Sequence, residues 1–169
     1  FRRRVVEVME SVALADDLDI LEYAAELLEK AKAPLDLVRQ GLDADLEESR
    51  EIMAATAIRQ IEARNKRALS KKTKEVLFET TALIRSWLRD VLMICGSSVN
   101  LIVNDDRTTA LESAAAKTDA ARVVCALAAV DEADTAIRYN VSPETCFDVL
   151  LLQIREELYG SHSARGVAK

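Results

Sequence analysis

The sequence predicts an all-α protein, a single bundle of about six or seven helices. About half of the 169 residues are Ala, Leu, Glu, Arg or Lys, and only four are Gly and two are Pro. This bias is typical of helical proteins. Apolar residues also recur every three or four positions through most of the chain, as the buried side of an amphipathic helix requires.

The most apolar of these periodic segments covers residues 76–95, and we expect the other helices to surround it. A seam recurs along one side of it: Leu77, Thr81, Ile84, Leu88, Val91 and Cys95. Four more apolar residues widen the seam: Leu83, Trp87, Leu92 and Ile94. A helix this broadly apolar must be covered on several sides. Gly96 should end it, because glycine readily takes the left-handed conformation that closes helices.

The residues before this segment predict further helices. A short amphipathic helix should bury Val5, Val6, Met9 and Val12. Asp16 and Asp17 can cap a second helix over residues 18–32, with an expected buried face of Leu21, Ala24, Leu28 and Ala31.

A break is expected at Ala33-Pro34, because the residue before proline is pushed out of the helical region. A long helix with a narrow apolar stripe should then cover residues 35–68. The pattern leaves open whether this helix continues into the apolar segment or a new helix starts at Ser70.

Residues 99–106 contain poor helix formers and should be an ordered loop. Three helices are expected after it, the second ending near Asn140 and the third rich in leucine. Their expected caps, in order, are Thr109 with Glu112, then Thr118, then Ser142 before Pro143.

A basic run lies between residues 59 and 74. It contains one acidic residue, Glu62, and seven basic ones: Arg59, Arg64, Lys66, Arg67, Lys71, Lys72 and Lys74. Such a run either contacts phosphates or forms a solvated helix face. The solvated face is favoured, because no aromatic residue interleaves these charges as single-strand stacking requires. The net charge of −6 also repels phosphate.

No pattern in the chain predicts catalysis, a metal site or a cofactor. The glycine-rich phosphate loops, the zinc spacings and the paired E-x-x-H motifs of di-iron bundles are absent from the sequence. Cys95, Cys125 and Cys146 are expected as small buried side chains in a reducing, cytoplasmic compartment. The alternative is a metal or catalytic cysteine, for which His162 is the only histidine. No uncharged apolar run is long enough to span a membrane.

Several short motifs occur in a recognisable order. They are Trp87-Leu88-Arg89-Asp90-Val91-Leu92, Val103-Asn104-Asp105, Tyr139-Asn140-Val141-Ser142 and Phe147-Asp148-Val149-Leu150. Together with the basic run from Arg64 to Lys74, they resemble the C-terminal collar domain of the delta-prime subunit of the bacterial DNA polymerase III clamp loader. The resemblance covers about residues 64–158. The chain departs from it at Phe147-Asp148, where the family usually carries Leu-Glu.

The resemblance implies a collar-like helical bundle with a scaffold role and no chemistry of its own. Such domains assemble as a hetero-oligomer with the other clamp-loader subunits, and the parent complex loads the sliding clamp during DNA replication. The chain would then bind no nucleotide itself and reach DNA only through the complex. Residues 1–32 would lead from a missing AAA+-type region, residues 33–160 would form the collar domain, and residues 161–169 a flexible tail.

The candidate structural or subunit-interface residues are Trp87, Arg89, Asp90, Asn104, Asp105 and Asn140. Arg89 and Asp90 either close the bundle as a polar pair or face a neighbouring subunit. Trp87 either packs in the core against the last helix or anchors an interface. Asn104 and Asp105 should cap or brace their loop, and Asn140 should end its helix.

Three other functions stay open at the level of the sequence. One is the collar domain of the related gamma/tau or delta subunit. Another is a free-standing cytosolic helical adaptor or regulator. The third is an enzyme with an unrecognised helical active site. An AAA+-type domain upstream of Phe1 would separate the clamp-loader subunits from the other two.

Overall fold

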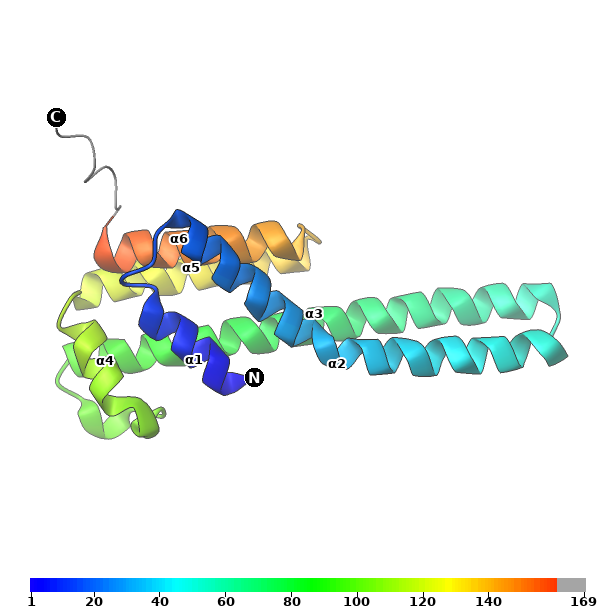
Figure 1. The fold of residues 1–169 in the computed structure, drawn as a ribbon, viewed down its shortest axis with the longest axis horizontal. Coiled ribbons are helices and arrows are strands. Elements are labelled where there is room, and N and C mark those ends of the chain that lie inside the picture. Colours follow the sequence, from blue (N-terminus) through cyan, green and yellow to red (C-terminus); the bar gives the residue numbers. More distant parts are fainter. Residues whose placement is uncertain (161–169) are drawn as a thin grey trace, which may run out of the picture.

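The computed structural model describes residues 1–160, apart from the side chain of Glu51; the expected tail, residues 161–169, lies outside the described residues. The described part is all-helical, which confirms the predicted class (Figure 1). Its α-helices are α1 (Arg2–Ser11), α2 (Asp17–Ile52), α3 (Ala55–Cys95), α4 (Thr108–Ala115), α5 (Ala120–Arg138) and α6 (Pro143–Tyr159). Two short 3-10 turns, η1 (Val99–Leu101) and η2 (Asp105–Arg107), connect α3 to α4.

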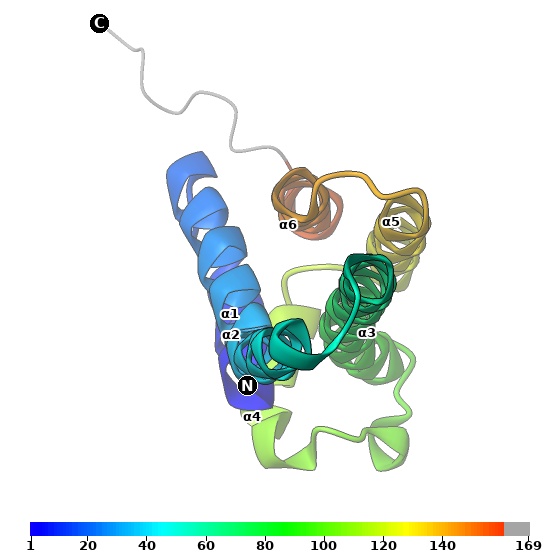
Figure 2. The ribbon, with the colours of Figure 1, turned by 90° about the vertical axis from the view of Figure 1, so that its right-hand side faces the viewer.

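The bundle is built from α3, α5, α6 and the first half of α2. Figure 2, which looks along the bundle, shows these four helices around a common interior. Each of α2 and α5 packs against both α3 and α6, while α1 and α4 cover further sides of α3. A single apolar core therefore contains residues from all six α-helices. The position after residue 32, expected as a domain boundary, lies within α2.

A two-helix arm extends from this bundle (Figure 1). We call residues 36–76 the arm: the second half of α2 and the first part of α3, running antiparallel past the ends of α5 and α6. No described side chain in the arm is buried. A half-buried seam that includes Leu42, Leu46, Ile61 and Leu69 joins its helices, together with the Arg50–Glu62 ion pair at 3.0 Å and a hydrogen bond from Asn65 to the Leu42 carbonyl at 3.3 Å. The arm therefore has little tertiary packing.

The expected helix over residues 35–68 is wrong. The chain reverses at Met53 and Ala54, whose backbones are extended, so α2 ends at Ile52 and α3 begins at Ala55. The reversal brings two narrow apolar stripes together, which a straight helix would leave in water. After it, α3 runs without interruption through Ser70 and the basic run to Cys95.

The expected break at Ala33-Pro34 is also wrong, because α2 continues through Pro34. Ala31 and Leu35, on either side of the proline, are both buried, while Pro34 itself is exposed. Core packing thus holds the helix, and the hydrogen bond that proline cannot donate is lost on the solvent side. α2 changes direction between its two halves, as a helix bends at an internal proline (Figure 1).

The ends of α3 and α5 confirm the predicted positions, but at α3 a different residue takes the left-handed conformation. Ser97 rather than Gly96 adopts the left-handed conformation, with φ of 58°, while Gly96 has φ of −88°. The Ser98 N–H donates to the Met93 carbonyl at 2.8 Å, which completes a Schellman closure. Asn140, with φ of 61°, closes α5 by the same arrangement, as expected of that residue.

Of the predicted caps, only Asp16 makes a capping hydrogen bond. Asp16 caps α2 in a reciprocal capping box with Asp19. The caps expected for α4 and α5 are wrong: Arg107 precedes α4 without a side-chain cap, and Asp119 replaces Thr118 by accepting the Arg122 N–H at 3.0 Å. Ser142 precedes Pro143 as expected, but it makes no cap bond.

Most of the predicted buried stripes are confirmed. Val5, Val6, Met9 and Val12 are buried, as is the α3 seam from Leu77 to Val91, whereas Cys95 is half-buried. The prediction that Leu21 is buried is wrong. Leu21 is 40% exposed, because Ile20 and Leu27 occupy the core side of α2 instead.

Candidate functional site

Asp90 forms the centre of a polar cluster at the end of the bundle away from the arm. Its carboxylate is fully buried in α3. One oxygen, Oδ2, accepts the backbone N–H of Val103 at 3.0 Å, the backbone N–H of Asn104 at 2.7 Å and the Asn104 side-chain amide at 2.7 Å. The carboxylate therefore supplies the acceptor that this stretch of loop backbone needs.

Asn104 carries the cluster on to the N-terminal helix. Its side chain is buried, and its Oδ1 accepts a hydrogen bond from Arg2 at 2.6 Å. Arg2 also forms an ion pair with Asp106 at 2.9 Å, and this hydrogen bond lowers the pKa of the Asp106 carboxyl and raises the pKa of Arg2. We call Arg2, Asp90, Asn104 and Asp106 the loop anchor, because they fix the loop between α3 and α4 to both α3 and α1.

Arg89 acts on the same loop from the solvent side. It donates to the Leu101 carbonyl at 3.0 Å, and its guanidinium lies 3.6 Å from Asp90 Oδ1. The Arg89–Asp90 pair therefore closes the loop over the end of the bundle, which is one of the two roles expected for it. Arg89 remains half exposed, with 46% of its side chain accessible.

The other predicted residues divide between the core and the surface. Asp105 is exposed and contributes its carbonyl, which accepts from the Thr108 hydroxyl, so its carboxylate does not brace the loop within the described residues. Asn140 lies in the α5–α6 turn, away from the loop anchor.

Trp87 is fully buried in the chain by itself. It belongs to the same apolar core as Phe147 and Leu151 of α6. The main helix neighbours of α3 in the bundle are α2 and α5, which flank it and also pack against α6 on the opposite side of the interior (Figure 2). Trp87 thus fills the interior that the four helices share.

Two polar links that tie the bundle together are not apparent from the sequence. Arg155, buried in α6, donates to the Ala15 carbonyl at 3.1 Å and pairs with Asp17, which fixes the start of α2. Asp134 of α5 accepts from Thr81 at 2.6 Å and from Arg85 at 3.0 Å. Their only advance signal is a charged residue within an apolar stripe, and that signal does not identify the partner.

Two groups of apolar side chains are exposed at the end of the bundle away from the arm. The first, which we call the turn patch, consists of Leu14 (85% exposed), Leu18 (65%) and Leu21 (40%) at the α1–α2 connection. The second, the loop patch, consists of Val99 (43%), Leu101 (53%) and Val103 (59%). The loop anchor and Arg89 hold the backbone that presents the loop patch.

The described residues contain neither a cluster of three metal-ligating side chains nor a helix long and apolar enough to cross a membrane. Cys146 is buried as expected and Cys95 is half-buried, and burial raises the pKa of both thiols. Cys125 is exposed, so the expectation that it is buried is wrong: it lies on the solvent side of α5. His162, the only candidate to assist a cysteine, lies outside the described residues.

Comparison of the chain with protein-family models, with curated proteins and with solved structures finds no match in any of the three.

Proposed function

We propose that this chain is a scaffold domain that joins unlike subunits, and specifically the collar domain of the delta-prime subunit of a bacterial DNA polymerase III clamp loader. The observation that carries the scaffold role is the pair of separate apolar patches at one end of the bundle. A subunit within a ring of unlike neighbours uses two different faces, one for each neighbour. Exposed apolar groups of this kind mark such contacts on soluble domains.

The loop anchor has a defined place in this function. The loop patch lies on the short η1 turn and the residues just after it, a connection that by itself would sample many conformations. Asp90 and Asn104 fix that backbone by buried hydrogen bonds, so Val99, Leu101 and Val103 are presented in one arrangement. The choice of the clamp loader among multisubunit assemblies rests on the motif order around these same residues, Trp87 to Asp90 and Val103 to Asp105.

Reconstitution with the other clamp-loader subunits of the same organism tests the proposal. We expect native mass spectrometry to show a hetero-oligomer that contains the 169-residue chain. The double variant Leu14→Glu/Leu18→Glu and the double variant Val99→Glu/Val103→Glu should each lose one neighbour. Leu37→Glu, at an equally exposed leucine in the arm, is the matched control and should assemble normally. A chain that stays monomeric with every subunit at about 10 μM would contradict the proposal.

The subunit assignment has its own tests. The chain should bind no ATP, because the phosphate-binding loop is missing from its sequence; calorimetry that detects micromolar binding would count against the proposal. The reading frame upstream of Phe1 separates the related subunits. An AAA+-type domain without a working nucleotide site supports delta-prime, and one with an intact phosphate loop supports gamma/tau.

The arm favours a second candidate, a free-standing helical adaptor. A projecting two-helix element with no buried described side chain is a common way to reach a partner, and the collar motifs do not require one. Under this alternative, Leu37→Glu in the arm would abolish partner binding while both bundle-patch variants retain it. That outcome is the reverse of the one expected for the collar.

A further inference from the structure

Four cations of α3 form a row that runs along the arm toward the bundle. Arg64, Arg67, Lys71 and Lys74 follow one another at steps of three, four and three residues, so they share one face of the helix. Among the described residues Arg64 and Arg67 have no acidic partner, and Lys71 lies 3.9 Å from Glu75. Glu75 is already paired with Lys72 at 2.8 Å, which raises the pKa of Lys72. We call Arg64, Arg67, Lys71 and Lys74 the basic patch.

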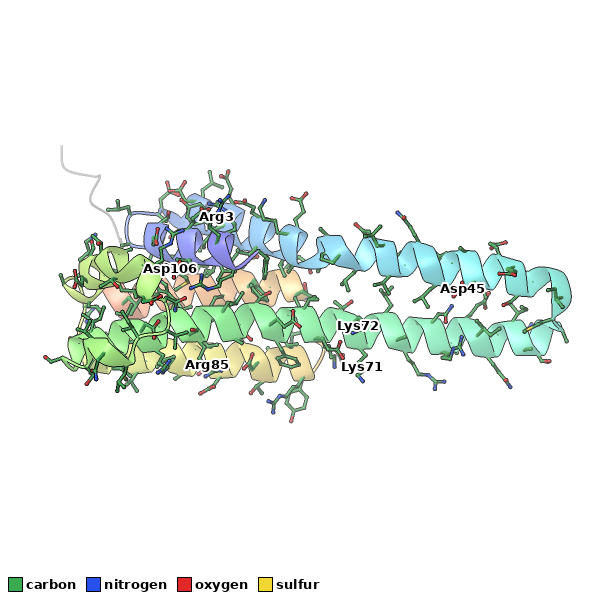
Figure 3. All side chains as sticks on the ribbon, turned by 90° about the horizontal axis from the view of Figure 1, so that it is seen from below. Arg3, Asp45, Lys71, Lys72, Arg85 and Asp106 are labelled. Atoms are coloured by element: carbon green, nitrogen blue, oxygen red, sulfur yellow. The ribbon has the colours of Figure 1, made fainter. Side chains whose placement is uncertain are left out.

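Further along α3, inside the bundle, the cation on this same face is paired with acidic residues. There Arg85 pairs with two carboxylates of α5, Asp131 at 2.7 Å and Asp134 at 3.0 Å. α5 ends beside the patch, because Lys74 donates to the carbonyl of Arg138, the last residue of α5. The basic patch is therefore the continuation of the α5-facing side of α3 at the point where α5 stops, as the labels of Arg85 and Lys71 show (Figure 3).

Tertiary structure also brings aromatic rings to this place. The Arg138 guanidinium lies over the Phe78 ring, 5.9 Å from its centre. The next residue, Tyr139, is 80% exposed. A shallow hollow beside them is lined by Arg67, Lys71, Lys74 and Phe78, among others. The row of cations thus ends where Lys74 contacts Arg138, next to the exposed Tyr139, although no aromatic residue interleaves the cations in the sequence.

We propose that the basic patch and Tyr139 form a contact site for single-stranded DNA. Cations along a groove that bind phosphates, together with an aromatic side chain on which a base stacks, are the two components of sequence-independent single-strand binding. Arg64 to Lys74 spans about 15 Å of helix, enough for a few phosphates. The site replaces the expectation that DNA is reached only through the parent complex. The choice of DNA over RNA rests on the proposed function; the choice of a single strand rests on Tyr139.

The site is tested by titrating a fluorescently labelled oligothymidylate of 20 nucleotides with the 169-residue chain and measuring fluorescence anisotropy. We expect weak, saturable binding at low salt. The logarithm of the binding constant should fall with the logarithm of salt concentration with a slope of about −3, as contact with roughly four phosphates of a single strand implies.

Matched variants separate the patch from general charge. Arg64→Glu/Arg67→Glu/Lys71→Glu should weaken binding at least tenfold. The control Arg3→Glu/Lys117→Glu/Arg122→Glu changes the net charge equally at exposed cations away from the patch and should weaken it by less than about threefold. Tyr139→Ala should weaken binding about fivefold or more, through lost stacking, with an unchanged denaturation midpoint because the ring is exposed.

Four outcomes would overturn the proposal: no binding at low salt, equal losses in the patch and control variants, tighter binding of duplex than of single strand, or equal binding of an RNA oligomer of the same length. A salt-sensitive dimer abolished by the patch variant, without oligonucleotide binding, would instead assign the patch to the acidic second half of α2 in another copy. The test is independent of reconstitution: failed DNA binding with intact assembly contradicts only this site, and DNA binding without assembly contradicts only the collar.

Discussion

The two halves of α3 belong to one uninterrupted helix but lie in opposite environments. Between Leu77 and Val91 eight of its residues are buried, with α1, α2, α4 and α5 packed around them. Between Ala55 and Val76 none is buried, and α2 is its principal neighbour. Regular secondary structure thus continues across a steep change in tertiary stabilisation. A helix with so little packing opens locally before the bundle does.

The halves also differ in how they treat charge. In the bundle each cation of α3 has a partner: Arg85 pairs with Asp131 and Asp134, and Arg89 bonds the Leu101 carbonyl. In the arm, Arg64 and Arg67 face solvent without an acidic partner among the described residues. The bundle therefore uses its α3 cations for structure, whereas the arm leaves Arg64 and Arg67 available for a ligand.

Truncating a side chain should cost far more stability in the bundle half of α3 than in the arm, and Trp87→Ala should show the largest effect. It should lower the free energy of unfolding by about 3–5 kcal/mol, the cost of deleting a large buried aromatic side chain, since Trp87 is fully buried. Urea denaturation followed by circular dichroism measures this. Leu46→Ala, in the half-buried seam of the arm, should cost about 1 kcal/mol or less.

Trp87 also allows a test without mutation, because it is the only tryptophan. Its emission should be blue-shifted and protected from quenchers in the free chain. Red, fully quenchable emission would show that the ring is exposed and would contradict the buried position.

Asp90→Ala should be the next most costly change. It leaves the Val103 and Asn104 N–H groups and the Asn104 amide without their acceptor, and hydrogen bonds to a buried charge of this kind contribute about 2–3 kcal/mol. Amide exchange should accelerate over residues 99–107. Asp105→Ala is the matched control at an exposed carboxylate, and it should change stability by less than about 0.5 kcal/mol. Equal effects of the two substitutions would contradict the loop anchor.

Gly41→Ala should stabilise the arm and so reduce the difference in local stability between the arm and the bundle. A methyl group at Gly41 meets no atom within 4 Å, and alanine favours an interior helical position over glycine by about 0.5–1 kcal/mol. Exchange should slow for the arm amides of α2 and stay unchanged in the bundle. Gly160→Ala should have the opposite sign, because Gly160 has a left-handed φ of 79° that strains an alanine by about 1 kcal/mol. Faster exchange in the arm of Gly41→Ala would contradict this account of its stability.

The smallest expected effect concerns pH. Hydrogen bonds from Lys32 and Ser142 lower the pKa of Glu144 to about 2. A carboxyl with a depressed folded-state pKa stabilises the fold above its unfolded pKa near 4.5, and this contribution is lost as pH falls from there toward 2. Glu144→Gln should flatten the stability profile in that window. The loss at neutral pH should be about 1 kcal/mol or less, because the Glu144 side chain is 62% exposed. An unchanged acid profile would contradict the Lys32–Glu144 link between α2 and α6.

The sequence by itself determines the helical class, the buried seam of α3 and the ends of α3 and α5. These follow from local chemistry: apolar spacing places Leu77, Ile84 and Leu88 on one side, and Asp16, Ser97 and Asn140 act on backbone groups within a few residues. Trp87 lies beside this seam, and the spacing left open whether it is buried in the core or at an interface; the structure places it in the core. Asp90 and Asn104, which both lie in the sequence motifs, bond to each other in the loop anchor.

Tertiary structure alone decides where the arm begins, which helices surround α3 and what the polar residues contact. Pro34 does not end α2 because Ala31 and Leu35 are both anchored in the core. Arg2 meets Asn104 across 102 positions of the sequence, and Tyr139 comes to the basic patch only because α5 ends beside Lys74. Periodicity reports which side of a helix is buried, but it does not report which other helix covers that side. That choice depends on the packing of the whole chain.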